Sequence, residues 1–248
     1  MVRSYWRFIR AFFQFLPLLL AYARDRHRFL VVGSSREVSS EIRRKRAREL
    51  KETLIDLGPT YIKLGQILST RPDVLPQEYI DELMELQDDV PPADYDELEK
   101  VIESDLGDPD EVFDYVDEDA ISGASLGQVH EGKYRGERVA IKVRRPGVES
   151  LVEADLHVLH FTLPILQRFV GEGHAQSMKG LADDFERRIR QEMNYYRESQ
   201  ILNEIRGNFA GDGRVVIPRT HDDVSSERVL TMEYVDGGHL GERRDEMD

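Results

Sequence analysis

Hydrophobic positions follow one period in the first part of the chain and another beyond about residue 112. Up to residue 106 they recur every three or four residues, which predicts amphipathic helices over about 37–57, 60–70, 77–87 and 94–106. The segments Gly58-Pro59, Arg71-Pro72 and Gly107-Asp108-Pro109 predict the breaks between these helices. In the second helix Lys63 and Gln66 lie three residues apart, so their side chains project from the same side. By spacing alone, a solvated helix face also explains this pair.

Beyond residue 112 the pattern shortens to alternation, which predicts strands. Residues 128–134 and 137–143 flank Arg135-Gly136 and predict a β-hairpin. In its second strand the residues at 139, 141 and 143 share one face, whereas Ala140 and Lys142 share the other. Residues 214–218 and 227–235 predict two further strands, which end at residues 236–238. We therefore expect an α+β fold with an antiparallel sheet.

The segment before the hairpin has the spacing of a glycine-rich phosphate loop, G-x-G-x-x-G-x-V, with small residues replacing two of the three glycines. The matching positions are Ser122, Ala124, Gly127 and Val129. Small residues let the backbone approach a phosphate, but a Cβ atom at 122 or 124 restricts positive φ values. The sequence therefore predicts a nucleotide loop that is stiffer than one built from glycines.

The strand after the loop supplies side chains that suit a nucleotide. Ala140 and Lys142 point the same way, so an adenine ring could lie against the alanine and the β-phosphate side against the ammonium group. The backbone from Glu233 to Val235 would then pair with adenine. Taken singly, Lys142 is also explained as a solvated strand lysine, but together with the loop it favours nucleotide contact.

A lysine in a phosphate site is oriented by a carboxylate from a neighbouring helix. The candidates Glu192 and Glu198 are six residues apart, about 240° around one helix, so they cannot both face Lys142. Periodicity does not choose between them. An exposed ion pair with a neighbouring arginine also explains either glutamate.

At 248 residues, with 40% hydrophobic composition, the chain can fill a sizeable core. The net charge of −14 disfavours a nucleic-acid partner. This charge fits ordinary solubility, but we favour adaptation to a cytosol of high salt, where screening removes self-repulsion. The sequence has no cysteine, which excludes disulfides, thiolate metal sites and a cysteine nucleophile.

Residues 1–51 carry thirteen Lys and Arg against four Asp and Glu, a net charge of +9. The uncharged stretch between Arg10 and Arg24 is thirteen residues long and contains Pro17, so it falls short of the about 20 residues that span a bilayer. An arginine-rich flank without a small-residue cleavage site disfavours a signal peptide. We expect residues 1–32 to lie in a membrane interface; the alternative is a helix packed on the protein's own core.

Together these motifs resemble the UbiB (AarF-type) family of atypical protein-kinase-like proteins, over most of residues 55–240. The resemblance rests on Lys63-Leu64-Gly65-Gln66, Ala124-Ser125-Leu126-Gly127-Gln128-Val129-His130, Val139-Ala140-Ile141-Lys142-Val143 with Arg145-Pro146-Gly147-Val148, and Glu192-Met193-Asn194-Tyr195 followed by Glu198. It implies a kinase-like small lobe, an antiparallel sheet plus a helix, with a helical N-terminal extension over the nucleotide cleft. It also implies work at membranes in isoprenoid or quinone lipid metabolism.

The resemblance implies that Lys142 is the nucleotide lysine and that Glu198 is its helix partner. It places Lys63 and Gln66 in the active site, where they limit access of protein substrates, with Glu192 and Asn194 lining the cleft beside them. The implied cofactor is ATP, and the chain itself is expected to hold no metal, with Mg²⁺ bound only when a large lobe is present. The nucleotide-binding set comprises Ser122, Gly123, Ala124, Ser125, Gly127, Val129, Ala140, Lys142, Glu233 and Val235.

The sequence departs from the family pattern in three places. Asn194 stands where the family has an aspartate, which removes one carboxylate, and Gly123 stands where alanine is usual, which should loosen the loop. After the hinge only residues 240–248 remain, so we expect the large lobe to be absent, with its catalytic aspartate and asparagine and its D-x-G. The chain alone should then not catalyse phosphoryl transfer. A truncated reading frame, half of a split gene and a segment of a longer protein stay open.

We expect four parts: a membrane-interface segment at 1–32, a helical extension at 33–111, the small lobe at 112–240 and a truncated tail at 241–248. The first function that fits is the ATP-binding small lobe of a UbiB-like atypical kinase or ATPase, with a companion large-lobe polypeptide. The alternative is a non-catalytic membrane-associated module that binds an isoprenoid lipid or a lipid-biosynthesis enzyme. Either protein would be cytoplasmic and bound peripherally to the inner face of the cell membrane.

Overall fold

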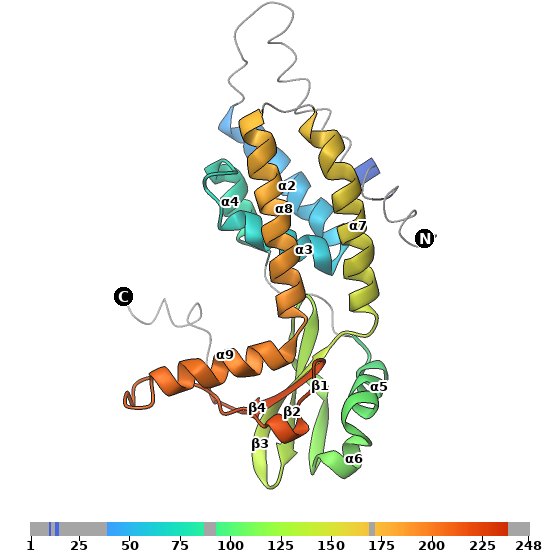
Figure 1. Ribbon diagram of the computed structural model, residues 1–248, viewed down its shortest axis with the longest axis vertical. Helices are drawn as coiled ribbons and strands as arrows, with labels where there is room; N and C mark the ends of the chain where they lie inside the picture. The colour runs from blue at the N-terminus through green and yellow to red at the C-terminus, as the bar shows by residue number, and fades with distance from the viewer. Residues whose placement is uncertain (1–9, 11–12, 15–38, 87–92, 169–171, 238–248) are drawn as a thin grey trace, which may run out of the picture. The chain divides into compact units, whose positions relative to one another are not determined.

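The structure is a computed structural model that describes residues 10, 13–14, 39–86, 93–168 and 172–237. These residues form two compact units (Figure 1). Of the described residues, the first unit comprises those up to 86, those at 124–126 and those within 147–191, and the second comprises those at 93–123, 127–146 and 192–237. The expected membrane-interface segment lies almost wholly outside the described residues, as does the expected tail, and the domain boundaries stay predictions.

The first unit is helical and contains α2 (Ser40–Leu57), α3 (Pro59–Ser69), α4 (Gln77–Leu83), α7 (Val148–Gln167) and α8 (Glu172–Glu192). Gly58 adopts a φ of 98° between α2 and α3, which a side chain disfavours, so the predicted break is confirmed. Helix α4 ends at Leu83, earlier than the predicted residue 87, because the chain turns there. Apolar side chains of α2, α3, α4, the turn after α4 and α7 share one core: Leu54, Leu57, Tyr61, Leu83, Leu86 and Val158.

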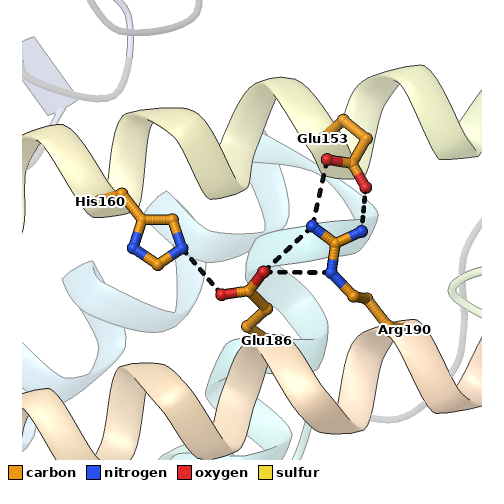
Figure 2. Close-up of polar contacts among 4 residues, drawn as sticks. All are labelled: Glu153, His160, Glu186 and Arg190. Carbon is orange, nitrogen blue, oxygen red and sulfur yellow. Dashed lines mark hydrogen bonds and ion pairs between the residues drawn. The ribbon is translucent and has the colours of Figure 1, made fainter.

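A chain of polar contacts joins α7 to α8 in this unit (Figure 2). The imidazole Nε2 of His160 lies 2.8 Å from Oε2 of Glu186. The guanidinium of Arg190 donates to the other oxygen of Glu186 at 3.0 Å and forms an ion pair with Glu153. All four side chains stay partly exposed, so the cluster joins the two helices but contributes little to stability.

The second unit is an antiparallel sheet with helices, as the α+β prediction requires. It contains α5 (Tyr95–Leu106), α6 (Pro109–Val112), β1 (Tyr115–Gly123), β2 (Gly127–Tyr134), β3 (Glu137–Arg144), α9 (Tyr195–Asn208), the 3₁₀ turn η1 (Asp222–Val224) and β4 (Val229–Glu233). The strands are hydrogen-bonded in the order β1-β2-β3-β4. Arg135 and Gly136 both have positive φ in the tight turn between β2 and β3, so the predicted hairpin is confirmed.

The two faces of β3 have the predicted characters. Val139, Ile141 and Val143 are fully buried and pack with Leu98 and Ile102 of α5. On the opposite face, Lys142 pairs in register with Val129 of β2 and Leu230 of β4, and Ala140 pairs with Glu131 and Met232. Helix α9 lies against β4, so the face that carries Lys142 has its own helical partner.

The predicted strand at 214–218 is wrong. Backbone and side-chain N–H groups of Arg214 donate to the carboxylate of Asp212, which folds the segment into a turn, and Pro218 has no N–H to give to a ladder. Pairing with β4 begins only at Arg219, whose carbonyl accepts from Glu233 N at 2.7 Å. The last predicted strand, 227–235, is present but shorter, as β4.

Residues 185–198 do not form one helix, contrary to the premise on which Glu192 and Glu198 were compared. Helix α8 ends at Glu192, and Asn194 leaves helical geometry at φ −107° and ψ 98° to cap α9. The two glutamates therefore belong to different helices, and the angle of about 240° between them does not apply.

Candidate functional site

Lys142 and Glu198 form an ion pair in the second unit. The Lys142 ammonium nitrogen lies 2.8 Å from Oε1 and 2.7 Å from Oε2 of Glu198. The lysine side chain is 19% exposed and the glutamate 33%, so the pair is shielded from water more than an ordinary surface pair. Glu198 sits in the first turn of α9, where the positive end of the helix dipole favours its charge. Between the two glutamates that the sequence left open, Glu198 therefore contacts the strand lysine.

The start of α9 is held in place by three contacts. The Asn194 side-chain oxygen accepts from Arg197 N at 3.1 Å, which makes it the N-cap of the helix. The Tyr195 backbone N–H donates to Glu227 O at 3.1 Å, and Arg144 donates to Met193 O. An aspartate would cap the helix equally well, so the departure from the family pattern at Asn194 preserves this structural role.

The predicted phosphate loop connects β1 to β2. Ser122 and Gly123 end β1, and Gly127 begins β2. Gly127 lacks the positive φ that would require glycine; instead, a Cβ atom there would lie 2.3 Å from the Tyr195 hydroxyl and 3.0 Å from Val143 O. Close approach of protein atoms therefore accounts for this glycine. Ala124 and Ser125 between the strands group with the first unit, and no described residue hydrogen-bonds the buried Ser125 hydroxyl.

The predicted adenine hinge follows β4 in the second unit. Glu233 N donates to Arg219 O, and Tyr234 N donates to Arg138 O at 3.2 Å. The Arg138 guanidinium lies 3.8 Å from the centre of the Tyr234 ring, which fixes the backbone beyond the strand. Val235 is exposed beyond these contacts. Its pairing with adenine stays a prediction.

The motif at 63–66 lies on α3 in the first unit. A Cβ atom at Gly65 would lie 2.3 Å from Leu86 Cδ1 and 2.8 Å from Leu54 Cδ1, so glycine lets α3 pack closely against its neighbours. The Gln66 side-chain amide donates to Leu86 O at 3.0 Å, which anchors the chain after α4. Two of the four motif residues thus have roles in packing. Lys63 is partly buried, and the active-site roles of Lys63 and Gln66 stay predictions.

Tyr195 belongs to one of the family motifs, but the sequence predicts no role for it. It is 1% exposed, and the Lys142 ammonium lies 4.8 Å from the centre of its ring. Burial raises the pKa of its hydroxyl, which stays protonated. The signal in the sequence was its position three residues before Glu198, which places both side chains on one side of a helix.

Gln128 and His130 of β2 are also buried, and no role for their side chains was predicted from the sequence. The Gln128 amide exchanges hydrogen bonds with the backbone of Ala93 and donates to His130 Nε2 at 3.0 Å. This assignment leaves the His130 proton on Nδ1, which donates to Asp117 O at 2.8 Å. Burial lowers the pKa of His130, so the ring is neutral. Its bond to Asp117 ties β2 to β1, and the bonds of Gln128 to Ala93 tie β2 to the segment before α5.

Comparison with known proteins identifies relatives over most of the chain. Residues 85–247 match the family described as ABC1 atypical kinase-like domain. The uncharacterized protein sll1770 of Synechocystis is 37% identical over 207 residues, which cover 83% of this chain and 35% of that protein. The chloroplastic protein ACTIVITY OF BC1 COMPLEX KINASE 8 of Arabidopsis thaliana is 38% identical over 214 residues, which cover 85% of this chain and 28% of that protein.

Among solved structures, the complex of Rv3197 with erythromycin from Mycobacterium tuberculosis is similar in fold, with a TM-score of 0.56 and 26% identity. The match covers 84% of this chain and 53% of that chain. This chain therefore spans about a third of the length of the curated relatives and about half of the solved one. The family expected from the motifs and the kinase-like α+β fold are both confirmed.

Proposed function

Because the chain belongs to the ABC1 atypical kinase-like family, we propose that its second unit binds ATP, with the phosphates against Lys142. The ion pair between Lys142 and Glu198 is the observation that carries this proposal. In kinase-like sites such a pair directs the lysine ammonium toward the α- and β-phosphates. A lysine with no such task would gain little from being held by both oxygens of one carboxylate.

The surroundings of Lys142 suit a phosphate group. An ammonium has three N–H donors, and among the described residues the Lys142 nitrogen donates only to the two oxygens of Glu198. A phosphate oxygen can accept the remaining donor. Ala140, two residues earlier on the same face, leaves room for a flat ring, and we propose that adenine lies there, toward the backbone of Glu233 to Val235.

We propose that phosphoryl transfer also needs residues beyond those that the structure describes. They contain no cluster of three or more carboxylate or imidazole groups that could hold a metal ion. We therefore propose that Mg²⁺ binds with the nucleotide only when a companion large-lobe segment supplies its ligands and a catalytic carboxylate. Lys142 and Glu198 would then bind and orient the triphosphate, and the active-site roles of Glu192 and Asn194 are part of the same proposal.

Lys63 and Gln66 are proposed to act at the nucleotide site, which they would restrict to small substrates. Replacing Lys63 with alanine should then change the preference between ATP and ADP more than it changes stability, whereas Gln66→Ala should also loosen the contact with Leu86. A role at the site would be contradicted if Lys63→Ala left the ratio of the ATP and ADP affinities unchanged and only lowered the melting temperature.

The membrane setting is a further part of the proposal. No helix among the described residues is long and apolar enough to cross a bilayer. We propose that the basic segment 1–32 holds the protein on the inner face of the cell membrane, close to isoprenoid or quinone lipid metabolism. The full chain should sediment with anionic vesicles, and a chain without residues 1–32 should not.

Thermal stability tests ATP binding directly. ATP at 100 times its Kd should stabilise the full chain by about 2.7 kcal/mol, because a ligand that binds only the folded state raises its melting temperature. Lys142→Met should reduce this shift strongly, because the phosphates lose the ammonium that binds them. Lys133→Met is the matched control, since Lys133 is an exposed lysine on the neighbouring strand, and it should keep the full shift. The proposal fails if Lys142→Met responds to ATP as the unmodified chain does. No response in either protein would favour the non-catalytic module.

A further inference from the structure

Tyr195 touches two parts of the proposed nucleotide site at once. Its ring lies under the Lys142 ammonium, and its hydroxyl occupies the space that a side chain at Gly127 would fill. Both neighbours belong to the elements that the nucleotide proposal uses, the strand lysine and the start of β2 after the loop. All three residues belong to the second unit, so these contacts lie within one compact body.

The ring lies where it can orient the ammonium. The distance of 4.8 Å from the Lys142 nitrogen to the ring centre is within the range of a cation–π interaction. Glu198 binds the same nitrogen through both of its oxygens. With the ring and the carboxylate each taking one side of the ammonium, the directions left for its remaining N–H are restricted.

Hydrogen bonding of the hydroxyl does not explain the position of the ring. No described residue hydrogen-bonds the buried Tyr195 hydroxyl, although leaving such a group unsatisfied costs stability. The ring is instead placed by the backbone: Tyr195 N donates to Glu227 O, and Asn194 caps the helix one residue earlier. Burying the hydroxyl costs stability, and backbone contacts hold the residue in place. We therefore look for the role of the ring in its contacts with Lys142 and Gly127.

We propose that Tyr195 is a positioning residue for nucleotide binding, whose ring sets the direction of the Lys142 ammonium toward the phosphates. This inference rests on the proposed ATP site. Tyr195 acts through Lys142 and not on the nucleotide itself, so its removal should weaken the phosphate-dependent part of binding. Binding of the adenosine part should be unaffected, because that part does not involve the ammonium.

The first test compares ATP with adenosine by calorimetry on the full chain. The ratio of their affinities reports the phosphate contribution, which a general loss of structure would not change selectively. Tyr195→Leu should lower this ratio about 5-fold, and Tyr195→Phe, which retains the ring, should restore it. Adding Tyr195→Leu to Lys142→Met should lower the ratio no further, because the ring acts through the lysine.

A second variant guards against a misfolded Tyr195→Leu protein. Tyr195→pentafluorophenylalanine keeps the shape of phenylalanine and reverses the charge distribution of the ring, so it should lower the ratio as Tyr195→Leu does. The proposal is overturned if this variant matches Tyr195→Phe, if Tyr195→Leu weakens ATP and adenosine equally, or if its effect adds to that of Lys142→Met.

A third measurement does not depend on ATP. The rate at which an amine-reactive ester acylates Lys142, followed by mass spectrometry of its peptide, reports how firmly the ammonium is held. Tyr195→Leu should raise this rate about 3-fold relative to Lys133 in the same sample. An unchanged rate overturns the proposal. If the unmodified chain does not bind ATP but the rate rises, the ATP site fails and the coupling of Tyr195 to Lys142 stands.

Discussion

Gly127→Ala offers a sharp test of the packing between α9 and the start of β2. The added Cβ would lie 2.3 Å from the Tyr195 hydroxyl, a distance that non-bonded atoms do not adopt. It would also lie 3.0 Å from Val143 O, which belongs to the backbone of β3 and cannot rotate away. The phenol ring is rigid and its residue is anchored through the backbone to Glu227, so neither neighbour yields easily.

We expect Gly127→Ala to destabilise the folded state by about 2 kcal/mol, the typical cost of overpacking a well-filled site. That cost corresponds to a fall of roughly 4–8 °C in the melting temperature of a chain of this length. Removing the hydroxyl should relieve the main clash, because the next ring atom, Cζ, lies 3.6 Å from the added Cβ, an ordinary contact. Adding Tyr195→Phe should therefore recover about 1 kcal/mol, with the contact to Val143 O responsible for the remainder.

The assay is a double-mutant cycle by thermal or urea unfolding, followed by circular dichroism. Tyr195→Phe alone should be neutral or slightly stabilising, because it removes a buried hydroxyl that no described residue satisfies. Gly132→Ala on the same strand is the matched control: its Cβ would also lie 3.0 Å from a backbone oxygen, but its closest contact at 2.5 Å is the flexible end of Ile141. Tyr195→Phe should not rescue it. Additive effects of Gly127→Ala and Tyr195→Phe, within about 0.5 kcal/mol, would refute the proposed clash.

Three further predictions follow from the second unit's polar contacts and from the α7–α8 cluster. Burial holds the pKa of His130 below 6.5, so below pH 6.5 the unfolded chain binds a proton that the folded chain does not, and stability should fall as the pH decreases through that value; His130→Asn should show a smaller slope between pH 6.5 and 5 in urea titrations. Asn194→Ala should cost about 1 kcal/mol in the same assay, and Asn194→Asp only a few tenths, because aspartate also caps a helix. Arg190→Gln should cost less than about 1 kcal/mol at low salt and nothing measurable in 1 M salt, since its carboxylate partners are partly exposed.

Sequence patterns predicted the hairpin because the alternation of its two strands and the residues of its turn are local properties. Arg135-Gly136 can adopt positive φ, and alternation on each side sets the faces, so the burial of Val139 and Ile141 followed without knowledge of distant segments. The strand predicted at 214–218 is wrong because local properties alone do not decide whether a strand forms. Its β-branched residues have high strand propensity, but a strand also needs a partner, and Asp212 binds the backbone that would have paired.

The sequence predicted the residues of the candidate site but not which glutamate contacts Lys142. Lys142 was found from its strand position, whereas the choice between Glu192 and Glu198 depended on whether the helix continued through Asn194. Periodicity does not show whether a helix continues through an asparagine, because a residue that caps a helix can also occur within one. The capping contact to Arg197 starts a new helix, which turns Glu198 toward the sheet independently of the direction of α8.

The ion pair is therefore part of a larger arrangement built around the start of α9. Asn194 caps the helix, Arg144 holds the carbonyl before it, and the Tyr195 backbone is bonded to Glu227, so Glu198 is presented from a fixed first turn. An exposed ion pair gains little because two flexible side chains must be ordered to form it. Here the start of α9 already restricts the side chain of Glu198, and the Tyr195 ring restricts that of Lys142. The absence of a side chain at Gly127 leaves room for the ring. A sequence that keeps the lysine and the glutamate but changes the glycine or the tyrosine would retain both charges and lose the geometry that directs them.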